Sequence, residues 1–269
     1  MKPQSVQRAL SPRFSVSRAL CLMGSCALLA GTAAAEFDVD LYADVLRDHT
    51  AETSRLAGTE VDYEAIAGDP RWPRLLAGLE AARPSAIRRP EERLAFWINA
   101  YNVLAIRMVI DHWPLESIRD AGSLIWPVWR REIARIEGER VTLHEIEHEI
   151  LRPTGEPRIH GAIVCASLSC PSLAREPYRG DQISAQLDAS MRRFLADPGK
   201  GLHIDRTERT VVLSRIFRWF SDDFDAAGGA LAFSARYAPD ADGAWIDTRL
   251  ETLDLEYFEY DWALNAPPR

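Results

Sequence analysis

The apolar positions in the first half of the chain recur at helical spacing. Residues 37–47 have this period. A stronger segment covers residues 90–111, where Pro90 suits the first helical position and the pattern ends before Trp113-Pro114. Its interior is apolar on nearly all sides, which predicts a buried central helix.

The period changes after this helix. Residues 132–141 alternate around Glu137-Gly138, which predicts a hairpin, and residues 158–166 form a nearly continuous apolar run, which predicts an interior strand. Further elements are predicted over 142–151 (a short helix), 183–195 (an amphipathic helix), 202–204 with 210–213 (paired strands) and 253–264 (a bulged strand). We therefore predict an α+β fold, a single domain with helices packed on a mainly antiparallel sheet around the buried central helix.

The N-terminus has the pattern of a secretory signal peptide. Residues 1–18 are polar and basic, residues 19–30 form an apolar run, and Ala33-Ala34-Ala35 follow. We expect cleavage after Ala35, which removes residues 1–35 and leaves residues 36–269 as one exported domain, periplasmic or extracellular in a bacterium. Cys26 keeps a lipid anchor open as an alternative; otherwise no stable membrane insertion is expected after cleavage.

The chain of 269 residues carries a formal charge of −8. The predicted signal peptide contains four basic residues and no acidic one, so 28 basic residues against 40 acidic ones leave −12 on the remainder. An acidic domain without a basic stripe argues against a nucleic-acid partner, because phosphate contacts dominate that affinity. The sequence does not indicate an oligomeric state.

The segment from His144 to His148 matches the H-E-x-x-H pattern of zinc hydrolases, with Glu145 as the base. A third zinc ligand would still be needed, and the spacing of Thr142 and Glu145 also fits a helix capping box. On the predicted helix, Glu147 lies on the apolar side and His148 on its shoulder. A carboxylate that faces a core needs a partner, so this pair belongs either to a structural clamp or to a site.

Two cysteines remain after the predicted cleavage. Cys170 precedes Pro171 and suits a helix N-terminus, where a thiol pKa is lowered, whereas Cys165 lies at the end of the apolar run, where it is raised. His160 is a candidate base, although strict strand alternation places it opposite Cys165 unless the strand ends or bulges there. A disulfide, a catalytic or ligand-binding thiol, and inert packing remain alternatives.

Several other polar and aromatic residues complete the candidate set. Amides on one face of the buried helix and hydroxyls between the cysteines are candidate substrate-binding groups: Asn99, Asn102, Ser167 and Ser169. Asp222 and Asp223 could orient a histidine, but such a pair more often caps or ends a helix. Four aromatic residues are most simply interpreted as core: Trp97, Trp219, Tyr260 and Trp262.

Five ordered segments resemble the domain of unknown function 547 family: Phe96–Asn102, Ile146–Arg152, Pro157–Pro171, Leu213–Phe224 and Tyr260–Asn265. The resemblance runs from about Val61 to Asn265 and implies no secure activity. It gives weight to His148, His160 and both cysteines, and makes His144 incidental. A distant likeness to papain- or transglutaminase-like folds is also indicated. In those folds the nucleophilic cysteine opens the central helix, which here contains none.

The leading functional prediction is a thiol-dependent hydrolase or transferase that acts on a small peptide-like or thiol substrate. Cys170 or Cys165 would be the nucleophile, His160 or His148 the base, and Glu147 the orienting residue. No cofactor is expected. The alternatives are a non-catalytic periplasmic binding or scaffold protein with a Cys165–Cys170 disulfide, and a zinc metallohydrolase that uses His144, Glu145 and His148.

Overall fold

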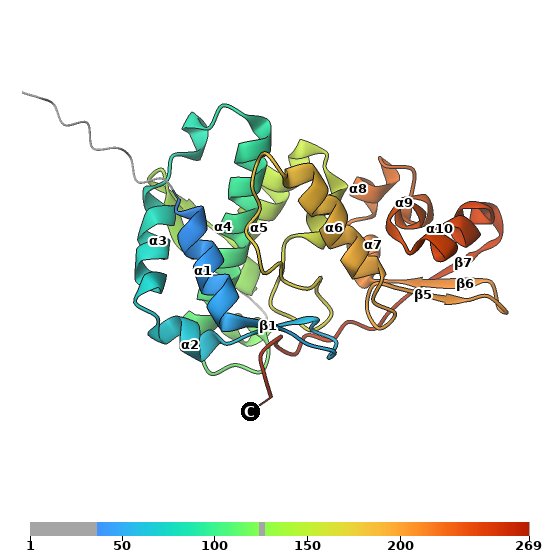
Figure 1. Ribbon diagram of the computed structural model, residues 1–269, viewed down its shortest axis with the longest axis horizontal. Helices are drawn as coiled ribbons and strands as arrows, with labels where there is room; N and C mark the ends of the chain where they lie inside the picture. Colours follow the sequence, from blue (N-terminus) through green and yellow to red (C-terminus); the bar gives the residue numbers. More distant parts are fainter. Residues whose placement is uncertain (1–36, 124–126, 269) are drawn as a thin grey trace, which may run out of the picture. The chain divides into compact units, whose positions relative to one another are not determined.

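The computed structural model describes residues 37–123 and 127–268, so the predicted signal peptide lies outside the described residues. The first half is helical (Figure 1). Its elements are α1 (Val39–His49), α2 (Tyr63–Gly68), α3 (Arg71–Ala81), η1 (Pro84–Ala86), α4 (Pro90–Asp111), η2 (Ile118–Ala121) and η3 (Val128–Arg130). Asp38 and Asp62 begin α1 and α2, because each carboxylate accepts a backbone N–H three residues later.

Helix α4 is the longest helix and matches the predicted range. Pro90 opens it with Glu91 and Glu92 in the first turn, and the residues from Ala95 to Ile106 are buried without a break. Its length and composition would allow it to span a membrane, but 78% of that stretch is buried inside the protein, as expected for a core helix. It contacts α2, α6 (Ile183–Leu195) and η4 (Ile146–Leu151).

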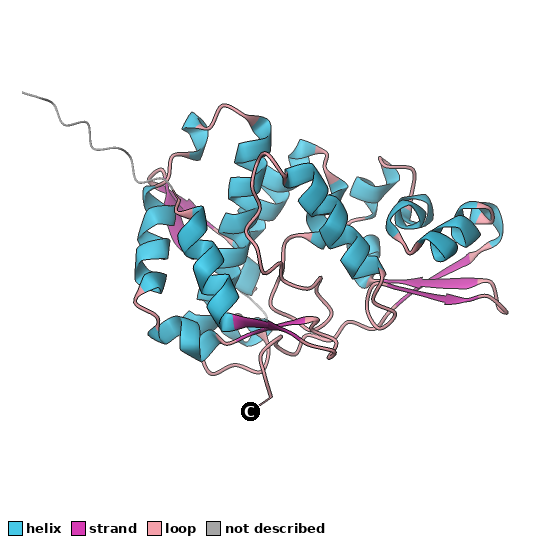
Figure 2. Ribbon diagram, viewed as in Figure 1, coloured by secondary structure: helices cyan, strands magenta, loops and turns pink. Residues whose placement is uncertain are grey.

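The strands of the described residues form three small sheets (Figure 2). β1 (Thr50–Glu52) pairs with β2 (Thr59–Val61), and β3 (Ala134–Ile136) pairs with β4 (Glu139–Val141) as the predicted hairpin. β5 (Leu202–Asp205) and β6 (Thr210–Leu213) pair antiparallel, and β7 (Asp254–Tyr257) runs parallel to β6. The α+β class is confirmed. Within the described residues, however, the strands do not join into the single, mainly antiparallel sheet that the pattern predicted.

The remaining helices alternate with these strands. They are α5 (Leu143–Glu145), the π-helical η4, η5 (Arg152–Thr154), η6 (Pro157–Gly161), α6, α7 (Arg215–Trp219), α8 (Ser221–Asp225), α9 (Ala230–Tyr237), α10 (Asp240–Asp247) and η7 (Leu250–Thr252). α6 has the predicted bounds. A second cluster of buried side chains lies among α6 to α10 and β5 to β7, beside the larger cluster around α4.

The predicted strand over 158–166 is wrong. Pro157 opens the 3-10 helix η6 instead, and the chain then runs irregularly toward Cys165. The side chain of Asn102 replaces a neighbouring strand here: it donates to the Ala162 carbonyl at 3.0 Å and accepts the Val164 N–H at 2.8 Å. A side-chain amide can therefore satisfy the backbone of an apolar segment that has no strand beside it.

The predicted strand over 253–264 is shorter than the pattern indicated. Regular pairing ends at Tyr257, where the alternation slips, so the slip marks a strand end rather than a bulge. The chain beyond it makes two isolated bridges, Ser117 to Ala263 and Ser167 to Leu264. The second bridge places the C-terminal segment (residues 258–265) beside the cysteine segment (residues 165–170). This pairing forms one side of the candidate site.

Candidate active site

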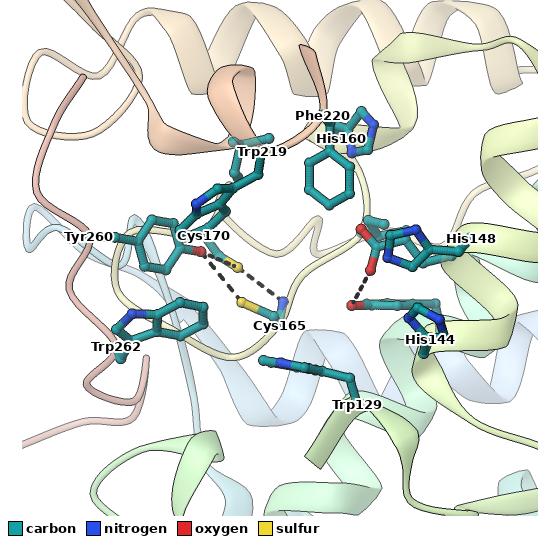
Figure 3. A pocket seen from close by; sticks show the side chains of 14 residues that line it. Trp129, His144, His148, His160, Cys165, Cys170, Trp219, Phe220, Tyr260 and Trp262 are labelled. Carbon is teal, nitrogen blue, oxygen red and sulfur yellow. Dashed lines mark hydrogen bonds between the residues drawn. The ribbon is translucent and has the colours of Figure 1, made fainter. Parts of the chain in front are cut away.

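A pocket of about 170 Å³ contains all five residues predicted to act in catalysis (Figure 3). It is bounded by α4, η3, α5, η4, η6, the cysteine segment, the end of α7 and the C-terminal segment. Its lining residues are Tyr101, Trp129, His144, Glu147, His148, His160, Ile163, Cys165, Cys170, Ile216, Trp219, Phe220, Tyr260 and Trp262. The space suits one small group, of about the size of a side chain or a ring.

The C-terminal segment holds the cysteine segment in place. Leu168 donates its N–H to the Ala263 carbonyl at 2.8 Å, and Asn265 donates its N–H to the Ala166 carbonyl at 3.0 Å. Ala166, one of these anchored residues, has φ 62°, in the left-handed region that residues other than glycine rarely occupy. Such backbone strain persists only where the surroundings impose it. The position of the thiols is therefore fixed by pairing with a segment about 95 residues later in the chain.

The two thiols share one set of hydrogen bonds. Cys170 Sγ accepts the Cys165 backbone N–H at 3.0 Å and lies 3.2 Å from the Tyr260 hydroxyl. Ser167 donates its hydroxyl proton to Tyr260 at 3.0 Å, which leaves the Tyr260 proton for the two sulfur atoms, of which Cys170 Sγ is the nearer and Cys165 Sγ lies at 3.5 Å. Cys165 Sγ lies 3.1 Å from the Ser167 hydroxyl.

This arrangement separates the acidity of the two thiols. Burial alone would raise the pKa of Cys170, but the hydrogen bonds from Cys165 and Tyr260 help to outweigh burial and lower it. The hydrogen bond to Cys170, together with burial, raises the pKa of Cys165. The pair therefore carries its first negative charge on Cys170. Both cysteines are free thiols here, so the structure does not contain the disulfide of the scaffold alternative.

The histidines are bound by other groups. His160 donates Nε2–H to Asp223 at 2.8 Å, and Arg152 holds the same carboxylate through Nε at 2.7 Å and Nη2 at 2.9 Å. Arg152 also donates to His148 Nδ1 at 2.8 Å. Among the described residues neither thiol is hydrogen-bonded to an imidazole, so the predicted cysteine–histidine contact is not formed. Asp223 orients a histidine rather than capping a helix.

The pKa values of both imidazoles of this network are lowered, which favours their neutral forms. Burial lowers the pKa of His160, although Asp223 acts in the opposite direction. Burial, His144 and Arg152 lower the pKa of His148 to about 4, and its Nδ1 accepts a proton from Arg152, as only a neutral ring can. Hydrogen bonds from His160 and Arg152 overcome the effect of burial and hold the pKa of Asp223 below its usual range. The positive charge of this network therefore stays on Arg152, against Asp223.

Glu147 lies on the π-helical turn η4, a backbone form that is common at functional sites. Its carboxyl group accepts one hydrogen bond in the structure, from the Tyr101 hydroxyl at 3.3 Å, and does not orient a histidine as predicted. Burial raises its pKa to about 7, while Tyr101 lowers it and the nearby Cys170 raises it further. Glu147 therefore keeps its proton up to about pH 7, well above the pH at which an ordinary glutamate ionises.

The four predicted substrate-binding groups do not line the pocket. Asn99 and Asn102 each bind the backbone of a neighbouring segment through both ends of the amide, at 2.8–3.0 Å. Ser169 accepts the Asp261 N–H at 2.9 Å, and Ser167 bonds Tyr260. These side chains satisfy buried backbone groups or position the thiols. They lie near the site for this structural reason and do not line the pocket.

In the H-E-x-x-H segment, Glu145 caps the start of its own helix. Thr142 and Glu145 form the predicted capping box, in which Glu145 accepts the Thr142 N–H at 2.8 Å and returns its own N–H to the Thr142 hydroxyl at 3.0 Å. The rings of His144 and His148 lie 4.3 Å apart. Across residues 37–123 and 127–268, no three His, Cys, Asp or Glu side chains come together in a geometry that could hold a metal.

The sequence alone did not identify every residue of the site: Tyr101, Trp129 and Phe220 were not among the candidates, and three others were interpreted as core. Tyr260, Trp219 and Trp262 were assigned to the core, where only Trp97 of that group lies. Trp219 is 45% exposed at the end of α7, and the other two rings follow the strand β7. The available signal was the segment Tyr260–Asn265, which belongs to the family resemblance.

These features define an α+β protein with a buried thiol pair, held by a tyrosine, at the base of an aromatic pocket. Residues 85–195 match the model of the family described as "Protein of unknown function, DUF547", so the family recognised from the sequence is confirmed for this part of the chain. The matched range includes Glu147, His148, His160 and both cysteines, and ends before Tyr260. Searches of curated proteins and of solved structures gave no match.

Proposed function

We propose that the protein is an exported thiol-dependent hydrolase or transferase with Cys170 as its nucleophile. The observation that carries this proposal is the set of donors at Cys170 Sγ, which receives the Cys165 N–H and the Tyr260 hydroxyl inside a pocket. A thiol becomes nucleophilic when its thiolate is stabilised. Here neutral hydrogen-bond donors would provide the stabilisation that an imidazolium provides in a cysteine–histidine pair.

The reaction would proceed through a thioester. The Cys170 thiolate attacks the carbonyl carbon of a small peptide-like substrate, a C–S bond forms, and the bond to the leaving group breaks with its electron pair. Glu147 keeps its proton up to about pH 7 and lines the same pocket, so it would protonate the leaving group. Water, or a thiol acceptor in a transfer reaction, then attacks the thioester, returns a proton to Glu147 and releases Cys170.

His160 and His148 would serve this reaction as neutral polar walls rather than as the base. His160 is fixed by Asp223 and stacks on Phe220 at 4.2 Å, which orients the ring and commits Nε2–H to the Asp223 carboxylate. The proposed likeness to papain- or transglutaminase-like folds rests on the buried helix α4 beside a pocket with cysteine and histidine. The nucleophile would differ, because it comes from the segment after η6.

The pH dependence of alkylation tests the nucleophile. We expect iodoacetamide to modify Cys170 at pH 6–7 far faster than an ordinary thiol, whose pKa is about 8.5. Cys165→Ser is the matched control, because it keeps the backbone donor and loses one thiol. A wild-type protein whose Cys170 reacts only above about pH 8.5 would refute the proposal.

A burst assay tests the thioester. With 4-nitrophenyl acetate we expect one equivalent of nitrophenolate per protein before steady turnover, and no burst from Cys170→Ala. Reduced and untreated samples are compared, because an oxidising compartment permits a disulfide between the two thiols. If untreated protein reacts with neither reagent but reduced protein reacts with both, the resting state is the disulfide of the scaffold alternative.

A further inference from the structure

One side of the pocket is an aromatic wall, which we define as Trp129, Trp219, Tyr260 and Trp262. Its rings touch in sequence: Trp219 to Tyr260 at 4.7 Å, Tyr260 to Trp262 at 4.5 Å, and Trp262 to Trp129 at 6.2 Å between centroids. Figure 3 shows the wall around the two sulfur atoms, with His144 and His148 on the opposite side. These rings come from three elements far apart in the sequence, so they meet only in the folded chain.

The ionisable groups that line the pocket favour negative over positive charge. Among its lining residues there is no lysine or arginine. The imidazoles of His148 and His160 are kept neutral, and Arg152 is paired with Asp223 outside the lining. The groups that can become charged negatively are the carboxyl of Glu147 and the thiol of Cys170. Apart from the imidazole of His144, the lining therefore offers no cation to a bound anion, whereas a bound cation can meet the Cys170 thiolate and, above about pH 7, the Glu147 carboxylate.

An aromatic face and a nearby anion favour the same ligand. The π-electrons of Trp and Tyr attract a cation that approaches the ring face, and the attraction grows when water is excluded. Arg119 already occupies this role outside the pocket, where its guanidinium carbon lies 5.2 Å from the centroid of Trp262. Trp219 has the most exposed ring of the wall and is the part of it that an incoming ligand can reach first.

We infer that this site selects substrates that carry a positively charged amino or alkylammonium group next to the reacting atom, with that group seated against the aromatic wall. The inference rests on the proposed function, since it assumes that Cys170 is the nucleophile. It adds the substrate class: a cationic, amine-bearing compound rather than a carboxylate, a phosphate or a neutral peptide.

Methanethiosulfonate reagents of opposite charge test the inference. The Cys170 thiolate attacks the sulfenyl sulfur of the reagent, a disulfide forms, and the S–S bond of the reagent breaks to release methanesulfinate with the electron pair. No other oxidant is required. The two reagents carry a 2-(trimethylammonium)ethyl or a 2-sulfonatoethyl group of similar size. Each rate is divided by the rate of the same reagent with 2-mercaptoethanol, and peptide mapping assigns the modified cysteine of the full chain.

We expect the cationic reagent to modify Cys170 at least about tenfold faster than the anionic one after this normalisation, which is the range of a partly desolvated cation–π contact. Trp219→Leu keeps an apolar side chain and should lower the ratio severalfold. At pH 8, where the Glu147 carboxyl is ionised, Glu147→Gln should also lower it. The matched control is Trp245→Leu, because Trp245 carries Arg206 at 5.0 Å from its ring but does not line this pocket.

The outcomes separate the two proposals. If neither reagent modifies Cys170, the proposed nucleophile fails. If both reagents modify it with a normalised ratio near one, or if the anionic reagent is faster, the nucleophile stands and the cationic substrate class is refuted. An equal fall of the ratio in Trp245→Leu and Trp219→Leu would also refute it. Each ratio is measured within one variant, so a general loss of reactivity through poor folding cancels.

Discussion

Replacing Glu147 by glutamine should change how stability depends on pH. The Glu147 carboxyl is buried, and its hydrogen bond in the structure comes from Tyr101 at a long 3.3 Å. The nearest guanidinium, that of Arg152, is committed to Asp223. Ionisation of Glu147 is therefore poorly compensated in the folded protein, whereas in the unfolded chain water solvates the carboxylate.

The magnitude follows from the pKa. Burial raises the pKa of Glu147 to about 7 from an ordinary value near 4.5. Because the folded state binds the proton more tightly, the free energy of unfolding falls as pH rises between these two values. A shift of this size corresponds to about 3 kcal/mol, and the opening to the pocket reduces it to roughly 2–3 kcal/mol. Glutamine cannot ionise, so Glu147→Gln should escape this loss.

Urea unfolding at pH 4 and pH 8 measures the effect. Glutamine and protonated glutamate differ in hydrogen bonding, so the absolute difference between the proteins at either pH is not the test. The test is the change of that difference: the variant should gain about 2–3 kcal/mol on the wild type between pH 4 and pH 8. Other titrating groups contribute equally to both proteins and cancel. A difference that is the same at both pH values would refute a buried, protonated Glu147.

Two further variants probe the surroundings of the site. Asp223→Asn removes the charge that holds His160 and Arg152 and should lower the free energy of unfolding at pH 7 by about 2–3 kcal/mol. Because the pKa of Asp223 is depressed, this cost should shrink as pH falls below about 4, and urea curves at pH 7 and pH 3 check it. Lys200 is 1% exposed and donates to the Ala57 carbonyl at 3.0 Å. Burial lowers its pKa to about 8, so the folded state disfavours the charge, and the wild type should gain about 2–3 kcal/mol on Lys200→Met between pH 8 and pH 10.5.

Local patterns predicted the parts of the fold that depend on local sequence. The ranges of α4 and α6 follow from an unbroken helical period, and the β3–β4 hairpin follows from Glu137-Gly138 between alternating residues. The segment 158–166 was misjudged because a short apolar run has no period that separates a strand from another buried conformation. The amide of Asn102, about 60 residues earlier, decides that segment, and its partner cannot be read from the sequence around it.

The sequence predicted which residues form the candidate site but not which residues they contact. The five predicted catalytic residues do line one pocket: Glu147, His148, His160, Cys165 and Cys170. They could be predicted because a polar or reactive side chain inside an apolar segment needs a partner or a function. Their partners were not predictable. Tyr260 reaches the thiols only because its segment pairs with the backbone of 166–169, and Asp223 reaches His160 only because the helix that carries it breaks at Phe220.

The choice of partner has a consequence for the proposed chemistry. A thiolate that is paired with an imidazolium depends on two protons, since it is lost when either group titrates. A thiolate held by a backbone N–H and a tyrosine hydroxyl depends on its own proton, because neither donor titrates near neutral pH; burial keeps the pKa of Tyr260 well above its usual value. In the proposed mechanism the acid limb of the rate therefore reports Cys170. The basic limb reports Glu147, whose proton must be present for the leaving group to depart. In this mechanism the ionisations of Cys170 and Glu147, rather than the ionisation of a histidine, set the working pH.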